Sequence, residues 1–167
     1  NPGRFGAGVT GLSFTDPYAV KHLLGCATTL EGRRELSAEF IQQVIEEFGG
    51  PEKFYRSIYV SALCPLGFVN HGININFYDD ADLQRRLTPH IGAWVRQQIG
   101  FGLRTNNTVV LGTGKLKQFV ERHVREQCGF EHVIYLEHPR YIMQYRRKER
   151  NAFVRRYVDT LRSVLDA

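Results

Sequence analysis

The stretch NNTVVLGTGKLKQFVERHVREQCG (residues 106–129) decides the fold class, because it contains two kinds of secondary structure in direct succession. Its first part, NNTVVLGTG, is short and rich in β-branched residues, which favours a buried strand followed by a tight glycine turn. Its second part is predicted as a helix that ends at Gly129. A strand that leads directly into a helix is the repeating unit of folds with a parallel sheet.

The same alternation continues on both sides of this stretch. The further predicted elements are a short helix from Asp16-Pro17 to Leu24, a helix over residues 37–50 with Ser37 as its N-cap, a strand over 53–63, a loop over 64–80, a helix over 79–100 with Asp79 or Asp80 as its N-cap and a bend at Pro89, a strand with its loop over 132–139, and a final amphipathic helix over 146–165. We therefore predict a single α/β domain over residues 1–167, with a central, mostly parallel sheet and helices on both faces.

Ligands of such sheets bind beyond the carboxyl ends of the strands. Four loops occupy these positions in the predicted order: NPGRFG (1–6), ALCPLGF (62–68), LGTGK (111–115) and LEHPRY (136–141). We expect the functional site where these loops converge.

Composition is that of a globular protein, with 43% apolar and 23% charged residues, and no apolar run reaches the ~20 residues of a membrane-spanning helix. The three cysteines, Cys26, Cys64 and Cys128, have no spacing typical of a metal site, and we interpret them as reduced thiols of an intracellular protein, in the cytoplasm or nucleoid if it is bacterial. No cofactor or metal is expected. The chain begins inside a glycine-rich loop, so we expect an upstream segment that contains a strand.

The net charge of +5 is concentrated near the C-terminal end. Residues 138–162 contain eight arginines and lysines but only two acidic residues. A neutral body with one basic region is typical of a protein that binds a polyanion such as nucleic acid, although a solvated helix face would have the same composition.

Two common kinds of catalytic site are disfavoured. The LGTGK turn lacks the phosphate-loop spacing, because Val109 stands where a glycine is needed and Leu116 where Ser or Thr is needed. Cys64 precedes a proline and has no neighbouring group in the sequence that would lower its pKa, so a structural cysteine is the favoured interpretation.

The remaining candidates are Asn1 and His138. Neither is a strong base, but the pair suits a reaction in which the leaving group departs with the bonding electrons. A histidine N–H can stabilise the new anion, and an asparagine amide can hold a water molecule.

The same residues carry a resemblance to a known family. Asn1-Pro2-Gly3, Phe5-Gly6, Thr10-Gly11 and Phe14 resemble the first motif of the single-strand-selective monofunctional uracil-DNA glycosylases. The segment SAEFIQQVIEEFGGPEKFYRSIYVSALCPLGF (37–68), the turn VVLGTGKLKQFVERHV (109–124) and EHPR (137–140) are similar to later segments of that family, in the same order.

This resemblance implies a three-layer α/β/α sandwich and a monofunctional DNA glycosylase, which hydrolyses the N-glycosidic bond of a flipped base in base excision repair and leaves an abasic site. It also implies roles for individual residues. Asn1 would position the attacking water, His138 would hydrogen-bond the base carbonyl, Phe14 would stack on the base, and Gly3 would leave room for it.

The chain departs from the family pattern around the base. The family's base-reading asparagine is replaced by Ala62. Either Asn74, Asn76 or backbone groups recognise the base in its place, or the pocket is less selective for the base. Ser13 replaces a proline before the stacking residue. The predicted base pocket comprises Gly3, Phe5, Ser13, Phe14, Ala62 and Asn76. We hypothesise removal of uracil and of deaminated purines such as hypoxanthine or xanthine.

The family's second motif, which EHPR resembles, departs as well, because residues 140–145 read RYIMQY. The apolar side chains of this segment would either form a wedge in the DNA or simply pack against the last helix. The expected DNA-binding residues are Arg140, Tyr141, Ile142, Arg146 and Arg147. A monomer is expected. The alternative to an enzyme is a catalytically idle module of the same fold that binds damaged DNA.

Overall fold

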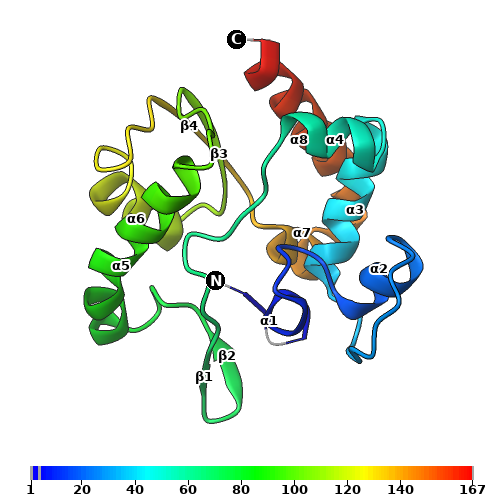
Figure 1. Cartoon of the computed structure of the whole chain (residues 1–167), viewed down its shortest axis with the longest axis horizontal. Coiled ribbons are helices and arrows are strands. Elements are labelled where there is room, and N and C mark those ends of the chain that lie inside the picture. The colour runs from blue at the N-terminus through cyan, green and yellow to red at the C-terminus, as the bar shows by residue number, and fades with distance from the viewer. Residues whose placement is uncertain (1, 4, 167) are drawn as a thin grey trace.

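The computed structural model describes residues 2–3 and 5–166. Figure 1 shows the elements in space, and in chain order they are α1 (Ala7–Thr10), α2 (Pro17–His22), α3 (Leu36–Phe48), α4 (Pro51–Ser57), β1 (Phe68–Asn70), β2 (Ile73–Ile75), α5 (Ala81–Ile99), β3 (Asn107–Leu111), α6 (Lys115–His123), β4 (His132–Leu136), α7 (Pro139–Tyr145), the 3-10 helix η1 (Arg147–Glu149) and α8 (Arg150–Asp166).

Two parallel strands form the centre of the fold. β3 pairs with β4 in a register that runs from Asn107 opposite His132 to Leu111 opposite Leu136. Successive residues of a strand point to opposite faces. Val109 and Leu111 accordingly pack against one hydrophobic core and Val110 belongs to another.

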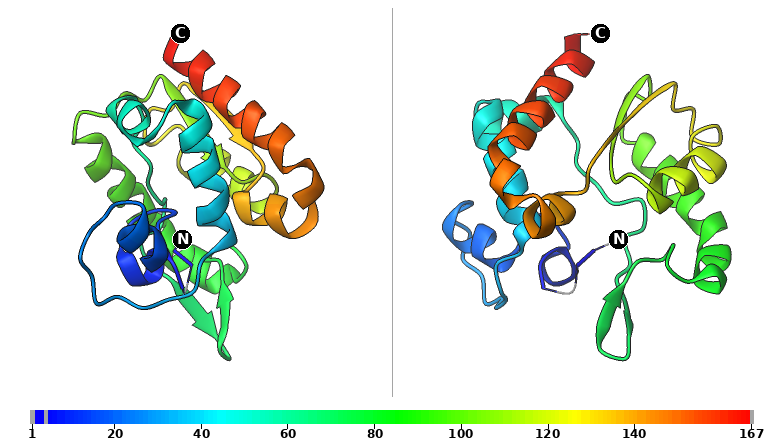
Figure 2. Two further views of the ribbon diagram at one scale, coloured as in Figure 1. Left: turned by 90° about the vertical axis from the view of Figure 1, so that its right-hand side faces the viewer. Right: turned by 180° about the vertical axis from the view of Figure 1, so that it is seen from behind.

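Helices cover both faces of these strands. The first core is formed with α3, α4, α7 and α8, and the second with α5 and α6. Figures 1 and 2 show these two groups of helices on opposite sides of the strands. The predicted three-layer α/β/α arrangement is therefore confirmed, although the parallel sheet among the described residues has only the two strands β3 and β4.

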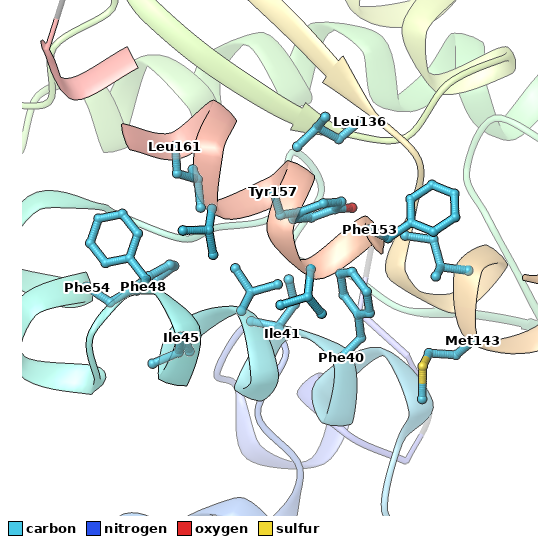
Figure 3. Packing of buried hydrophobic residues seen from close by; sticks show 14 residues of the cluster. Phe40, Ile41, Ile45, Phe48, Phe54, Leu136, Met143, Phe153, Tyr157 and Leu161 are labelled. Atoms are coloured by element: carbon cyan, nitrogen blue, oxygen red, sulfur yellow. The ribbon is translucent and has the colours of Figure 1, made fainter. Parts of the chain in front are cut away.

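The contact between α3 and α8 is the centre of the first core (Figure 3). Phe40, Ile41 and Ile45 lie on one side of α3 at helical spacing and face Tyr157 and Leu161 of α8. The rings of Phe40 and Tyr157 meet edge to face, with centroids 5.0 Å apart. Burying each of these side chains contributes about 1.5–3 kcal/mol to the stability of this side of the sheet.

Several predicted boundaries are confirmed. Asp80 caps α5, where its carboxylate accepts a hydrogen bond from the Leu83 amide at 2.8 Å, and the helix continues through Pro89. Asp16 caps α2 in the same way, through the Ala19 amide at 2.8 Å, with Pro17 as the first helical residue.

Several predictions about the elements are wrong. The strand over 53–63 is instead helix α4 followed by residues 58–63, which form no strand and pass between the two halves of the molecule (Figure 1). Gly50 and Pro51 start the helix, and it is retained because it buries Phe54 against Phe48, with ring centroids 5.5 Å apart. Packing thus overrides the β propensity of the segment.

The N-cap of α3 is Glu35 and not Ser37. A hydrogen bond from the Glu35 amide to the buried Asp16 carboxylate, at 2.8 Å, fixes the chain where the helix begins. The predicted loop over 64–80 also contains a two-stranded antiparallel hairpin, β1–β2, whose turn residues His71 and Gly72 both have positive φ. Two positive φ values are what a tight hairpin turn requires.

Within the part of the chain that the structure describes, no helix combines the length and the apolar character that crossing a membrane demands.

Candidate active site at the end of β4

His138 lies one residue beyond Glu137, which follows the end of β4, and it is the N-cap of α7. Its Nδ1 atom accepts a hydrogen bond from the backbone N–H of Arg140 at 3.1 Å. A backbone N–H can only donate, so Nδ1 carries no proton in this arrangement. The neutral imidazole therefore holds its proton on Nε2, where it is available as a donor.

The protein also keeps this imidazole neutral. Burial lowers the pKa of His138 to about 4, and the positive charge of Arg140 acts in the same direction. At neutral pH the side chain is thus an uncharged donor that can stabilise a developing anion without first releasing a proton.

A cavity of about 220 Å³ opens beside His138. It is lined by Tyr78, Gly112, Thr113, Leu116, His138 and Tyr141. Gly112 follows β3 and His138 follows β4, so the cavity lies at the carboxyl ends of the parallel strands, as expected for this fold. Gly112 has φ of 155°, a conformation that side chains rarely adopt, and a Cβ atom there would also stand 2.6 Å from Leu116 Cδ2, so glycine is favoured at this wall.

The position of His138 is fixed from α8. The Tyr157 hydroxyl donates a hydrogen bond to the Glu137 carbonyl oxygen, and Arg156 Nη1 contacts the Glu137 carboxylate at 3.0 Å. Pro139, directly after His138, is buried as well. Glu137, before His138, and α7, after it, are therefore both held by contacts with the first core.

Phe14 approaches His138 from the N-terminal loop (residues 1–14). The two ring centroids are 6.0 Å apart and the rings are inclined by 48°. Phe14 has φ of 51°, a left-handed conformation that is strained for a large side chain by about 1–3 kcal/mol. The sequence predicted both residues for the site, and the structure brings them together.

The N-terminal loop is organised by its own hydrogen bonds. The Gly8 amide donates to the Gly3 carbonyl oxygen at 2.8 Å, and the Thr10 hydroxyl donates to the Thr15 carbonyl oxygen at 2.6 Å. Asn1, the predicted water-positioning residue, lies outside the described residues. Its placement opposite His138 therefore stays a prediction.

The remaining residues of the predicted base pocket do not line the cavity at His138. Phe5 is exposed and the Arg33 guanidinium lies over its ring, 6.0 Å from the centroid. Asn76 donates its side-chain N–H to the Asp79 carboxylate at 2.8 Å and so closes a turn. Ser13 and Ala62 are both partly buried.

The predicted DNA-binding residues differ in their exposure. Tyr141 is exposed, and its ring lies 5.4 Å from that of Tyr145, which is 72% exposed. Arg140 is exposed as well. Ile142 was predicted wrongly, because it is fully buried in the first core and its side chain cannot reach DNA.

The two remaining arginines, Arg146 and Arg147, differ in their partners. The Arg146 guanidinium forms two hydrogen bonds of 2.5 Å with the Glu149 carboxylate. Arg147 is more exposed, and its contact with Glu39 is a looser one of 4.0 Å. Arg147 is therefore the freer of the two charges.

Other catalytic chemistry finds little support. Burial raises the pKa of the Cys64 thiol, the opposite of what a thiolate nucleophile needs. Among the residues that the structure describes, no group of His, Cys, Asp and Glu side chains could hold a metal ion.

Sequence reasoning missed three residues of this region. Tyr78 lines the cavity, and its pKa is raised to about 12 by burial and by Asp79, so its hydroxyl stays protonated. Thr113 lies in the turn that was expected at a strand end but given no role. Glu35, next to the N-terminal loop, carried no sequence signal because nothing in its spacing relates it to residues 3–6.

Comparisons with known proteins find similar sequences and structures. The sequence model of the uracil DNA glycosylase superfamily matches residues 1–162. A crystal structure of wild-type SMUG2 from Pedobacter heparinus superposes with a TM-score of 0.93 at 34% sequence identity, covering 100% of this chain and 74% of that one. A search of curated proteins found no match.

Proposed function

The chain belongs to the uracil-DNA glycosylase superfamily, and we propose that it hydrolyses the N-glycosidic bond of a deaminated base in DNA, leaving an abasic site. Membership confirms the resemblance of the sequence and supports DNA glycosylase activity in general. The observation that carries the more specific proposal is the neutral His138 imidazole, with its proton on Nε2, beside the cavity and Phe14.

The proposed reaction needs little acid or base strength. The target nucleotide leaves the stack and its base lies against His138, where the neighbouring Phe14 offers a ring for stacking. As the bond from C1′ to the base breaks, its electrons leave with the base, and the negative charge accumulates on the base carbonyl oxygens. The N–H at His138 Nε2 donates a hydrogen bond to such an oxygen.

Water completes the hydrolysis. A water molecule held by the Asn1 amide attacks C1′ of the cationic sugar and loses one proton to solvent, which leaves a hydroxyl group on C1′. The departed base takes up a proton from water. Asn1 is assigned this role through the family resemblance and through its place in the loop that brings Phe14 to His138.

A broad choice of base is supported by two residues of the predicted base pocket, although neither lines the cavity at His138. Ala62 has no polar group with which to read the edge of uracil, and the Asn76 amide is engaged with Asp79. We therefore propose that uracil, hypoxanthine and xanthine are all accepted. Arg140, Arg146 and Arg147 would contact the DNA outside the cavity, and Tyr141 would contact it from the cavity wall. We propose that the protein acts as a monomer within the cell.

The test is a base-release panel with the full-length protein. Oligonucleotides that contain one uracil, hypoxanthine or xanthine are incubated with the parent and with Asn1→Ala, and the free base and the DNA affinity are both measured. We expect release by the parent, and a release slower by about 100-fold for Asn1→Ala with little change in affinity. Release of uracil alone would contradict the broad pocket, whereas DNA binding without release would support an idle damage-binding module.

A further inference from the structure

The cavity beside His138 has a polar lining without charge. Among the described residues that line it, none is an arginine, lysine, aspartate or glutamate. Tyr78, Thr113 and Tyr141 contribute hydroxyl groups, and His138 contributes a neutral imidazole. A phosphate group is normally bound by arginine or lysine. The lining therefore suits an uncharged polar ring better than the backbone of DNA.

The size of the cavity fits the same kind of ligand. Its volume is about 220 Å³, below the ~300–1,000 Å³ of pockets that take drug-sized ligands. This space suits a single base better than a whole nucleotide. His138 belongs both to the cavity wall and to the contact with Phe14, so a base that lies against the imidazole also borders the cavity.

Tyr78 is held firmly at one wall of this cavity. The residue before it, Phe77, is fully buried, and the two rings meet edge to face with centroids 5.0 Å apart. The residue after it, Asp79, accepts the Asn76 side-chain N–H at 2.8 Å and lies 3.5 Å from the Lys115 ammonium group. Both neighbours of Tyr78 are thus fixed, one in the second core and the other at the start of α6.

The hydroxyl of Tyr78 has no partner within the described part of the chain. A buried or partly buried tyrosine usually pairs its hydroxyl, as Tyr135 does by donating to the Glu121 carboxylate at 2.8 Å. Burial and the charge of Asp79 raise the pKa of Tyr78 to about 12, so the phenol keeps its proton at neutral pH. A fixed ring therefore presents an unused hydrogen-bond donor next to the imidazole.

We propose that Tyr78 determines base specificity, because its hydroxyl donates a hydrogen bond to a second carbonyl oxygen of the base that His138 engages. This inference rests on the proposed function. It supplies the polar contact with the base that the methyl group of Ala62 lacks. A hydroxyl rotates about its C–O bond and can donate or accept, so it selects less strictly than an amide with fixed donor and acceptor ends.

The bases differ in what they offer to Tyr78. Uracil and xanthine each carry two carbonyl oxygens, whereas hypoxanthine carries one. When His138 engages one carbonyl oxygen, a second is left for Tyr78 only in uracil and xanthine. Loss of the hydroxyl should therefore change the ranking of the bases, whereas general damage to the site would slow the release of all three alike.

The experiment measures kcat/KM for the release of uracil, xanthine and hypoxanthine from otherwise identical DNA by the full-length protein. The variants are Tyr78→Phe and the matched control Tyr55→Phe, at a tyrosine that is 51% exposed. We expect Tyr78→Phe to lower kcat/KM by about 3–10-fold for uracil and xanthine and by less than about twofold for hypoxanthine, the range for one lost hydrogen bond. The control should match the parent. Equal losses for the three bases, or no loss for any, would overturn the proposal.

Stability is measured on the same proteins by urea denaturation. The Tyr78 hydroxyl has no partner among the described residues, so Tyr78→Phe should leave the midpoint of unfolding unchanged. A clear loss of stability would mean that the hydroxyl is bonded within the protein and is not free for a base, which would also overturn the proposal.

A binding measurement separates this inference from the proposed function. DNA with one 2′-fluoro-2′-deoxyuridine resists cleavage, because the fluorine disfavours positive charge on the sugar. We expect Tyr78→Phe to bind this DNA about 3–10-fold more weakly than the parent, with unchanged affinity for abasic DNA. Equal affinity for the fluorinated DNA, or an equal loss for abasic DNA, would contradict a contact with the base. If the parent releases no base but the difference in binding is found, the proposed function fails and the base contact stands.

Discussion

The imidazole and the N-terminal loop are held in place by different means. His138 is followed by α7, whose Ile142 and Met143 are buried in the first core, and α8 fixes the residue before it. The N-terminal loop buries little apolar surface and is held by hydrogen bonds and by the Glu35 carboxylate. Substitutions in the core that supports His138 should therefore act mainly on stability, whereas substitutions at the contacts that hold the loop should also change the rate.

The largest effect on stability is expected at Tyr157. Tyr157→Ala removes a fully buried ring that packs on Phe40, and such a change costs about 3–5 kcal/mol of the free energy of unfolding. Tyr55→Ala, at a tyrosine that is 51% exposed, should change that free energy by less than about 0.5 kcal/mol. Urea denaturation followed by circular dichroism measures both. Similar losses in the two variants would contradict the assignment of the core.

A smaller loss of stability, coupled to a loss of rate, is expected at Asp16. Asp16→Ala leaves two backbone N–H groups without their acceptor, at a cost of about 1–3 kcal/mol. The matched control is Asp80→Ala, which removes the N-cap of α5 far from the loop in sequence and costs about 1 kcal/mol.

The rate of base release distinguishes the Asp16→Ala and Asp80→Ala variants. Measured below the unfolding transition of each variant, release should slow in Asp16→Ala and stay at the parent rate in Asp80→Ala. A slow Asp80→Ala protein would mean that any lost cap lowers activity, and the special role of the loop would be withdrawn.

The next effect is a pH dependence that originates at His138. Its pKa is lowered to about 4 in the folded protein, against an ordinary value near 6.5 in the unfolded chain. Between these values the unfolded chain binds more protons, so the contribution of His138 to stability is complete above pH 6.5 and is lost as the pH falls toward 4. Base release should show no titration near pH 6.5.

Titration of ¹⁵N-labelled histidine by NMR measures this directly. We expect the His138 resonances to move only near pH 4, with the Nδ1 signal of an unprotonated nitrogen at neutral pH. The exposed His132 is observed in the same spectra as an internal comparison. A His138 midpoint near 6.5, or a proton on Nδ1, would contradict the role assigned to it.

The smallest effect is expected at the basic residues after α7. Arg147→Ala should weaken binding to DNA more than Arg146→Ala, because Arg146 already shares its charge with Glu149. Each loss should lie below about 1 kcal/mol at physiological salt and shrink further as salt rises. Fluorescence anisotropy over a salt series tests the order, and a change in base preference in either variant would place these residues nearer the pocket than the structure does.

The sequence predicted the elements whose own residues determine them. The strands and helices around LGTGK and the caps at Asp16 and Asp80 follow from local patterns, and the site at the strand ends follows from the topology. The same local reasoning failed for residues 53–57, because Phe54 gains its burial only through contact with Phe48.

Long-range contacts explain the rest. The sequence left open whether Ile142 is a wedge for the DNA or packs against the last helix, and the path of α7 places it in the core. Glu35 and Tyr78 come near the site only when distant segments fold together, so their spacing in the chain gives no sign of it. The residues that do the proposed chemistry were thus easier to find than those that hold them in place.

The most direct test compares His138→Ala with His132→Ala in single-turnover release of uracil from DNA. Our account predicts a rate lower by about 10²–10³-fold for His138→Ala, the usual cost of removing a hydrogen-bond donor that faces a developing anion, and a rate like the parent's for His132→Ala. A His138→Ala protein that releases uracil within about threefold of the parent, a difference well below that cost, would contradict the account.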